Sequence, residues 1–230
     1  MKKIGLIGGM SWESSQVYYE IINKKVREIL GGFHSCKCIM ESLDFAEIEK
    51  LQHKGDWTTL NKRMVEAAKN LELAKAEVII LCTNTMHLCS KEITQNISVP
   101  FLHIAEATGK KIKEKKLKKV LLLGTKFTME KDFYKKSLNE NFNIEVIIPN
   151  EVDREIVHKV IYKELVHGII KPESKEKYQR IIAKSVKDGA QGVILGCTEI
   201  PLLIKDQDVK IPIFDTTKIH AESAVEFALG

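Results

Sequence analysis

No stretch of the 230-residue chain approaches the roughly 20 consecutive apolar residues that a membrane-spanning helix requires, so no membrane partner is expected. Residues 1–4 lead directly into a glycine-rich turn without a cleavable apolar segment, and a secretory signal is not expected either. Low-complexity tracts are also missing. These absences indicate a globular protein, long enough for one large domain or for two small lobes that each bury a core.

Neither the charge nor the cysteines of the chain indicate an unusual partner. The net charge is +5, and the one dense basic run, Lys110–Lys119, carries Glu114 and no aromatic residue. Such a run is typical of a solvated helix face or a connector, so nucleic acid is not expected as a partner. The cysteines number five, an odd count, and lack the spacing of a disulfide framework. Reduced thiols fit better, and we expect a cytoplasmic location.

Two short apolar runs, one in each half of the chain, end in the same pair of residues. Glu77–Leu81 is followed by Cys82–Thr83, and Gly192–Gly196 is followed by Cys197–Thr198. Runs of this length, rich in β-branched residues, are typical of strands that are buried on both faces, as in parallel sheets. A thiol and hydroxyls at the carboxyl end of such a strand lie where open α/β sheets keep their chemistry.

Strand and helix patterns alternate along the rest of the chain. Periodicity and capping residues predict strands at residues 2–10, 34–43 and 99–104, and helices at 12–30, 45–53, 57–74 and 86–96. The pattern then recurs in the same order and at nearly the same spacing: residues 118–125 match 2–9, residues 193–198 match 78–83, and residues 211–215 match 99–103. The alternative is chance, because apolar strands followed by Gly or Pro look alike in any α/β protein.

The recurrence predicts an α/β fold made of two similar lobes in which strands and helices alternate. Each lobe has a parallel sheet, the two are related by a pseudo-two-fold axis, and the active site is expected in the cleft between them. We expect the amino-terminal lobe to comprise residues 1–112 and 208–230, and the carboxy-terminal lobe to comprise residues 113–207.

Such a repeat makes Cys82–Thr83 and Cys197–Thr198 equivalent positions on opposite sides of one site. Two proton carriers placed in this way can remove a proton from one face of a carbon and return it to the other, which inverts the centre. A thiol suits this task because its pKa is easily adjusted by its neighbours. No lysine lies in a convincing Schiff-base context, and Gly5–Gly9 only partly resembles the dinucleotide-binding fingerprint.

Three motifs carry a resemblance to a known family: Gly8–Ser14, the pair Asn84–Thr85, and Gly196–Glu199. With these, the chain resembles the aspartate/glutamate racemases, which are cofactor-independent amino-acid racemases. It is most similar to a bacterial subgroup in which the first catalytic motif is written CTNTMH. The resemblance covers essentially the whole chain. It implies two Rossmann-like lobes, two-base proton transfer without pyridoxal phosphate or metal, an amino-acid substrate and a homodimer.

The resemblance also implies which residues act. The catalytic cysteine of the amino-terminal lobe falls on Thr83, and that of the carboxy-terminal lobe falls on Cys197. The positions that hold the substrate's carboxylate and amino groups fall on Thr83, Asn84, Thr85, Thr198 and Glu199. Two further substrate-contact positions fall on Met10 and Gln52.

The chain departs from the family pattern at two positions. Thr83 replaces a thiol, and Cys82, one residue earlier, is expected to face the core because neighbours in a strand point to opposite faces. A hydroxyl is a much weaker acid and base than a thiol, whose pKa is about 8.5. Since the resemblance assigns the L-enantiomer to Cys197, we expect a bias towards L-substrates. Val166 stands where some aspartate racemases have a lysine, so recognition of an acidic side chain is not assured.

Other residues allow more than one interpretation. His87 is expected either to hold or polarise the substrate or to bond to the backbone at the start of a helix. Glu199 is expected to contact the substrate or to place a carboxylate at a helix amino end. His103 and His220 are expected to be structural, Cys89 to lie in the core, and Cys36 with Cys38 not to bind zinc for want of a second ligand pair.

We therefore predict an amino-acid racemase that acts on aspartate, glutamate or a broader set of amino acids. One alternative is an enzyme of the same superfamily, either a hydantoin racemase or a maleate isomerase. The other is a catalytically decayed amino-acid binding protein, because Thr83 is not a thiol.

Overall fold

The computed structural model describes all residues, 1–230, and divides the chain into two compact units. The first unit comprises residues 1–104 and 220–230, and the second comprises residues 105–219. These boundaries differ from the predicted ones at 112 and 207. Residues 208–219 belong to the second unit because they contain a strand that pairs within its sheet, and residues 105–112 form a helix of that unit.

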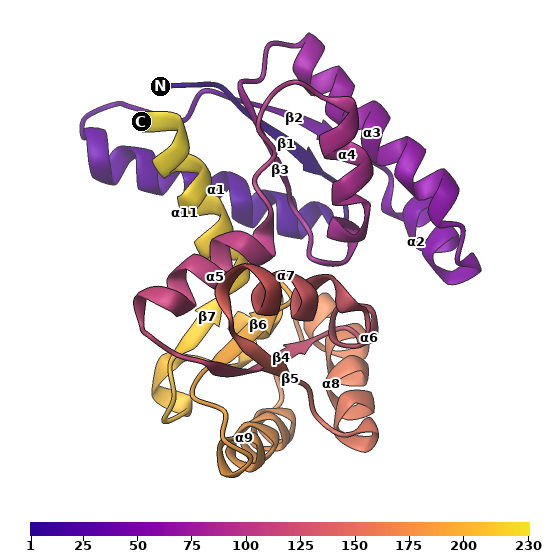
Figure 1. Ribbon diagram of the computed structural model, residues 1–230, viewed down its shortest axis with the longest axis vertical. Helices are drawn as coiled ribbons and strands as arrows, with labels where there is room; N and C mark the ends of the chain where they lie inside the picture. The colour runs from indigo at the N-terminus through magenta and orange to yellow at the C-terminus, as the bar shows by residue number, and fades with distance from the viewer. The chain divides into compact units, whose positions relative to one another are not determined.

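The first unit is built on a three-stranded parallel sheet with the order β2-β1-β3. Its strands are β1 (Ile4–Gly8), β2 (Cys38–Ser42) and β3 (Val78–Leu81). Figure 1 shows the helices around this sheet, which are α1 (Trp12–Leu30), α2 (Phe45–Lys54), α3 (Trp57–Leu73) and α4 (Ser90–Asn96), with the 3₁₀ helix η1 (Thr85–Cys89).

Both faces of this sheet are covered, which explains the continuous apolar runs of its central strands. Every residue of β1 and β3 is buried. On one face, Ile7, Ile79 and Leu81 belong to a core cluster that contains the apolar side of α3. On the other, Ile4, Leu6, Val78 and Ile80 pack with residues of α1 and of the C-terminal helix: Tyr18, Ile22, Val26, Ala221, Ala224 and Val225.

The second unit has a four-stranded parallel sheet with the order β5-β4-β6-β7. Its strands are β4 (Lys119–Gly124), β5 (Glu145–Ile147), β6 (Val193–Gly196) and β7 (Ile213–Asp215). Its helices are α6 (Lys126–Glu130), α7 (Asp132–Phe142), α8 (Glu151–Lys163), α9 (Pro172–Lys187) and α10 (Ile200–Leu203), with the 3₁₀ helices η2 (Leu165–His167) and η3 (Asp206–Asp208).

Two helices run across the unit boundaries. These are α5 (Ile104–Glu114), whose first residue belongs to the first unit, and α11 (Thr216–Leu229), which begins in the second unit and ends in the first. The structure thus confirms the predicted α/β class, with a parallel sheet in each half of the chain.

The predicted strand at residues 99–104, the fourth of the first half, is wrong. Residues 99–104 form a single bridge, in which Phe101 lies beside Ile79, rather than a strand. Two backbone hydrogen bonds hold it there, from Ile79 N to Pro100 O at 2.9 Å and from Leu102 N to Ile79 O at 3.0 Å. The chain then enters α5 at Ile104, which leaves too few extended residues for a ladder. The matching segment of the second half does form strand β7.

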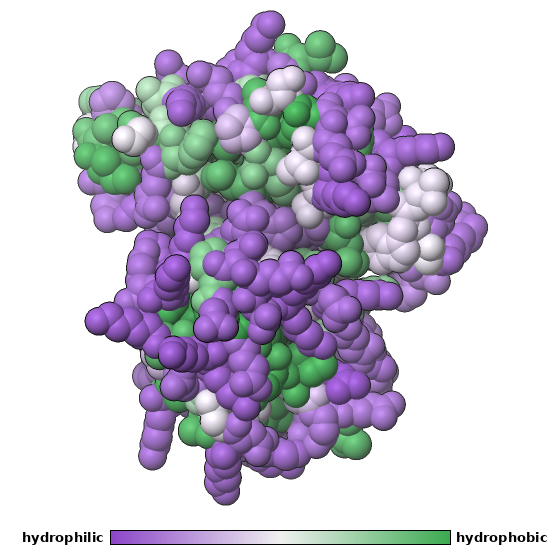
Figure 2. All heavy atoms as spheres, in the orientation of Figure 1, coloured by the Kyte–Doolittle hydropathy of each residue, from purple (hydrophilic) through white to green (hydrophobic).

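Strand β2 is also shorter than predicted. It starts at Cys38 because its partner β1 starts opposite, at Ile4, so residues 34–37 have no ladder to join. The basic run Lys110–Lys119 is mostly exposed around the buried Ile112, as expected for a solvated surface. Figure 2 shows largely hydrophilic side chains over the visible face of α5. None of the helices combines the length and apolar character that crossing a membrane would take.

Candidate active site

Most of the residues singled out in the sequence lie just after the carboxyl ends of three strands, β1, β3 and β6, whereas Gln52 lies on a helix. Strands β1 and β3 are neighbours in the sheet of the first unit, and β6 belongs to the sheet of the second. The carboxyl edge of a parallel sheet is where α/β proteins hold their ligands. In each unit the candidate residues therefore lie at the edge of the sheet where a ligand is expected.

The turn after β1 depends on a glycine. Gly9 has φ of +86°, and a Cβ atom there would lie 2.1 Å from the carbonyl oxygen of Leu43. Its N–H donates to the hydroxyl of Ser15 at 2.8 Å, which ties the turn to the first turns of α1. Met10 follows and is buried, at 4% exposure, in the same core cluster as Leu81.

Gln52, the second predicted substrate contact of this unit, lies on α2 and is also buried, at 7% exposure. Its side-chain amide donates to the sulfur of Met86 at 3.0 Å. Met86 belongs to η1, directly after the Thr83 turn, and shares a core cluster with Met10. The structure therefore brings Met10 and Gln52 to the segment that contains Thr83, Asn84 and Thr85.

In the turn after β3, the thiol of Cys82 and the hydroxyl of Thr83 lie in different surroundings. Cys82 is fully buried in the core cluster formed with α1 and α11, and burial raises the pKa of its thiol. Thr83 is only half-buried, Asn84 is buried, and Thr85 begins η1. The orientation predicted for Cys82 is confirmed. Its thiol packs as an apolar side chain in the core, whereas Thr83 is the residue with exposed surface.

His87 is held by the backbone. It is fully buried, and its Nδ1 atom lies 2.8 Å from the carbonyl oxygen of Thr83. Burial, followed by the neighbouring His103 and His220, lowers its pKa well below the ordinary value. Of the two interpretations of His87, the structure favours the one in which it bonds to the backbone.

The turn after β6 joins a thiol to a carboxylate. Cys197 follows the last residue of β6 and is partly exposed, and its Sγ–H donates to Oε2 of Glu199 at 2.9 Å. Burial, and then the negative charge of Glu199, raises the pKa of Cys197 well above that of an ordinary thiol. In the resting protein Cys197 is therefore a thiol that is bonded to a proton acceptor.

Glu199 does not serve as a helix cap. It precedes α10, but its side chain makes no cap hydrogen bond with that helix. Its carboxylate is turned to Cys197 instead, which argues against the interpretation of Glu199 as a helix-end carboxylate. The sequence contained both residues, but their contact depends on the backbone turn at Thr198.

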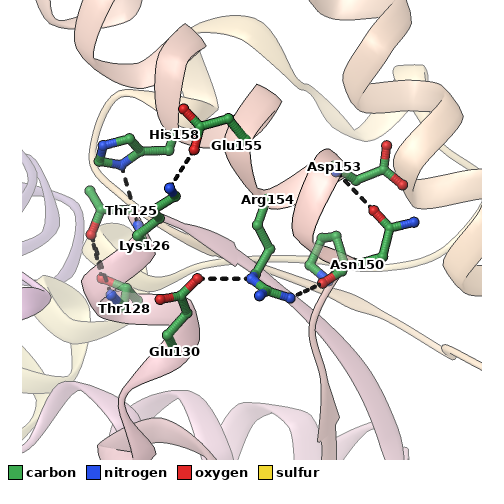
Figure 3. A network of polar contacts seen from close by, with 10 residues as sticks. Thr125, Lys126, Thr128, Glu130, Asn150, Asp153, Arg154, Glu155 and His158 are labelled. Atoms are coloured by element: carbon green, nitrogen blue, oxygen red, sulfur yellow. Dashed lines mark hydrogen bonds and ion pairs between the residues drawn. The ribbon is translucent and has the colours of Figure 1, made fainter.

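Figure 3 shows the polar network that braces the turn after β4, the strand beside β6. Thr125 caps α6, and its hydroxyl accepts from the backbone N–H of Thr128 at 3.3 Å. Two ion pairs tie α6 to α8: Lys126 with Glu155, and Arg154 with Glu130 at 3.0 Å. Both cations are paired, so the network fixes this turn rather than presenting a charge to a ligand. Val166, which stands at the lysine position of some relatives, is exposed and adds no charge.

The remaining cysteines lie outside this arrangement. Cys89 is buried in the core, as predicted. Cys36 and Cys38 are partly buried at the start of β2, and a hydrogen bond from Cys36 lowers the pKa of Cys38 to about 7. This difference between two similar thiols could not be predicted from the sequence. Nowhere in the chain do three or more His, Cys, Asp or Glu side chains gather in an arrangement that could hold a metal ion.

Known proteins of the same size resemble this chain over its whole length. The chain is 51% identical to a candidate Asp/Glu racemase of known structure from Yersinia pestis, with all of both chains covered and a TM-score of 0.96. It is 39% identical to an aspartate racemase homologue from Pyrococcus horikoshii OT3, again with full coverage of both chains and a TM-score of 0.90.

A sequence relative with a named activity is more distant. The broad-specificity amino-acid racemase of Bacillus subtilis (strain 168) is 29% identical over 182 residues, which cover 76% of this chain and 75% of that protein. A family model described as Asp/Glu/hydantoin racemase matches residues 7–224. The chain therefore belongs to the Asp/Glu/hydantoin racemase family, a family of isomerases.

Proposed function

We propose that the protein is an amino-acid racemase of the aspartate/glutamate type, which transfers a proton at the α-carbon without pyridoxal phosphate or metal. The observation that carries the proposal is the Cys197–Glu199 hydrogen bond of 2.9 Å at the carboxyl end of β6. A thiol beside a carboxylate is the pairing that a proton-abstracting cysteine needs. Family membership and the named activity of the Bacillus subtilis relative support the same chemistry.

Cys197 acts on the L-enantiomer in this proposal. The raised pKa means that the thiol must first lose its proton, and Glu199 is positioned to accept it. The resulting thiolate removes the α-proton, so that the Cα–H bond breaks and an S–H bond forms, and the electron pair remains on the α-carbon beside the substrate's carboxylate. Burial raises the basicity of the thiolate, which favours abstraction from a weak carbon acid.

Thr83 serves the opposite face of the α-carbon. Its hydroxyl gives its proton to the carbanion and takes up another from solvent water, which forms the new Cα–H bond on the opposite face and leaves Thr83 as a neutral hydroxyl. It cannot rest as a base in the way a thiolate does. The two directions of reaction are therefore unequal. Abstraction from an L-substrate begins at a thiol with a built-in proton acceptor, whereas abstraction from a D-substrate begins at a hydroxyl. We infer an enzyme that is biased towards L-substrates.

The polar groups around these two residues hold the substrate. We assign Asn84, Thr85 and Thr198 to the substrate's carboxylate and amino groups, and Met10 and Gln52 to its side chain. Glu199 acts on Cys197 and contacts the amino group. We also propose a cytoplasmic homodimer: all five cysteines are free, which suits a reducing compartment, and the dimer is proposed by resemblance to the family.

Exchange of the α-proton in deuterated water tests the function. The protein is incubated with single enantiomers of a panel of amino acids that includes aspartate and glutamate, and both deuterium incorporation and inversion are measured. Exchange that is lost in Cys197→Ala supports the racemase. Tight amino-acid binding without exchange would favour the binding protein, and turnover of maleate without exchange would favour the isomerase. Equal rates for L and D would contradict the bias.

A further inference from the structure

Three histidines and a tyrosine of the first unit form a buried cluster that has no part in the chemistry described above. His87 and His220 are fully buried, and the ring of His87 lies 4.8 Å from that of His103 and 5.4 Å from that of His220. Tyr18 packs edge-on against His220 at 5.7 Å. These residues come from α1, η1, α11 and the segment just before α5, so the cluster joins four separate parts of the unit.

The hydrogen bonds of His87 fix the position of its proton. Nε2 accepts from the backbone N–H of Ile104 at 3.2 Å, and a backbone N–H can only donate. Nδ1 lies 2.8 Å from the carbonyl oxygen of Thr83, which can only accept. His87 must therefore be neutral with its proton on Nδ1. Protonation would place an Nε2–H against the N–H of Ile104 and break that bond.

His220 has the opposite arrangement. Its Nε2 lies 2.8 Å from the carbonyl oxygen of Leu102 and must donate to it, so its Nδ1 accepts from the hydroxyl of Tyr18 at 2.9 Å. Leu102 and Ile104 flank His103, so the two imidazoles both bond to the backbone of this short segment, one on each side of His103. His220 fixes the segment to α1, and His87 connects the segment to the turn that contains Thr83.

We propose that His87 is the positioning residue for Thr83, and that His220 and Tyr18 hold the segment against which His87 is braced. The inference rests on the proposed function. The Nδ1–H of His87 fixes the carbonyl of Thr83. Because the β-branched side chain of threonine has few allowed χ1 rotamers, a fixed backbone also limits the directions in which the hydroxyl can point. The buried imidazole thereby aims the weaker of the two proton carriers.

Two substitutions separate the two bonds of His87. In His87→Asn, the side-chain amide nitrogen takes the place of Nδ1 and donates to Thr83 O, but the side chain cannot reach Ile104. In His87→Gln, the longer side chain places its amide oxygen near the former position of Nε2, where it accepts from Ile104 N, but the donor to Thr83 is lost. The two variants thus both carry a side-chain amide, but His87→Asn retains the bond to Thr83 and His87→Gln retains the bond to Ile104.

The readout is the ratio of inversion to exchange for an L-substrate in deuterated water. Exchange that returns the L-enantiomer needs only Cys197, whereas inversion needs Thr83 as well. We expect His87→Gln, which loses the donor to Thr83, to lower this ratio about tenfold, since small errors in position are costly to a reacting group. We expect His87→Asn, which loses only the brace at Ile104, to lower it less. Partial unfolding would scale both rates equally and leave the ratio unchanged. A ratio that stays constant in both variants, or that falls in both alike, overturns the proposal.

A second measurement does not depend on activity. In ¹⁵N-labelled wild-type protein, the imidazole resonances of His87 should show a protonated Nδ1 and an unprotonated Nε2 at neutral pH. The reverse tautomer or a charged ring would overturn the inferred brace even if the protein is an active racemase. The expected tautomer could also be found in a protein that neither exchanges nor inverts any amino acid. That result would refute the proposed function and the role of His87 in positioning Thr83, but the hydrogen bonds inferred for His87 would still be correct.

Discussion

The turns that follow β3 and β6 occupy the same place in their sheets but are differently equipped. After β6, a partly exposed Cys197 donates to Glu199. After β3, the thiol of Cys82 is sealed in the core, and a hydroxyl, that of Thr83, occupies the position with exposed surface. One turn carries a thiol bonded to a carboxylate, and the other carries a hydroxyl next to a carbonyl that is bonded to a neutral imidazole. The difference teaches that the same place in two similar sheets can hold side chains of very different acidity.

The largest effect should come from removing the stronger half. Cys197→Ala should lower α-proton exchange of L-substrates by about a thousandfold or more, because the general base itself is lost. Exchange measured by mass spectrometry tests this. Cys82→Ala is the matched control, since Cys82 is a buried thiol at the equivalent strand end and should cost stability rather than exchange. An equal loss of exchange in the two variants would show that the thiols after β3 and β6 do not differ in function.

Making the two turns alike is the next test. Thr83→Cys replaces the hydroxyl with a thiol and should raise exchange of D-substrates by about a hundredfold, towards the rate seen with the L-enantiomer. Thr83→Ser keeps a hydroxyl and should not raise it. If Thr83→Cys left the D-rate unchanged, then Thr83 would not be the residue that faces the D-proton.

Glu199→Gln tests whether the charge of Glu199 raises the pKa of Cys197. The substitution removes the negative charge that raises the pKa of the thiol, so that pKa should fall towards its ordinary value. Thiolate absorbance followed against pH should therefore appear at lower pH in Glu199→Gln than in the wild type, and Glu173→Gln, at an exposed position, serves as a surface control. Activity should nevertheless decrease, since the proton acceptor is gone. An unchanged titration would mean that Glu199 has no electrostatic effect on Cys197.

Acid should weaken the first unit through its buried histidines. Burial lowers the pKa values of His103 and His220 to about 4, so the unfolded chain takes up protons below pH 6.5 that the folded chain does not. Stability should fall as pH drops from about 6.5 to 4, by up to about 1.4 kcal/mol per pH unit for each histidine.

Urea unfolding at a series of pH values measures this slope. His220→Gln removes one titrating group and should flatten the slope while lowering stability at pH 7, whereas His53→Gln, at an exposed position, should leave it unchanged. A slope that is the same in His220→Gln and in the wild type would show that the imidazole is not buried in its neutral form.

Much of the fold could be read from the sequence, because buried parallel strands and amphipathic helices leave strong periodic patterns. The bounds of α1 were predicted to the residue, since Ser11 caps its start and Gly31 ends it. Residues 99–104 were misread because an apolar segment containing a proline can be a strand or a single bridge, and only the sheet decides. Family motifs pointed to Cys197 and Thr83. The bond between Cys197 and Glu199, and the path from His87 through His220 to Tyr18, could not be predicted, since they depend on side-chain directions and on contacts between distant segments.

The paired thiols at the start of β2 have a practical consequence. The hydrogen bond from Cys36 lowers the pKa of Cys38, whereas burial and the charge of Glu199 raise that of Cys197. Alkylating reagents should therefore modify Cys38 well before they reach Cys197. Free thiols should then be lost faster than enzyme activity. Inhibitors ranked by how fast they label the protein would be ranked by their reaction with Cys38 rather than with Cys197. Covalent screens against this enzyme should begin from a Cys38→Ser background.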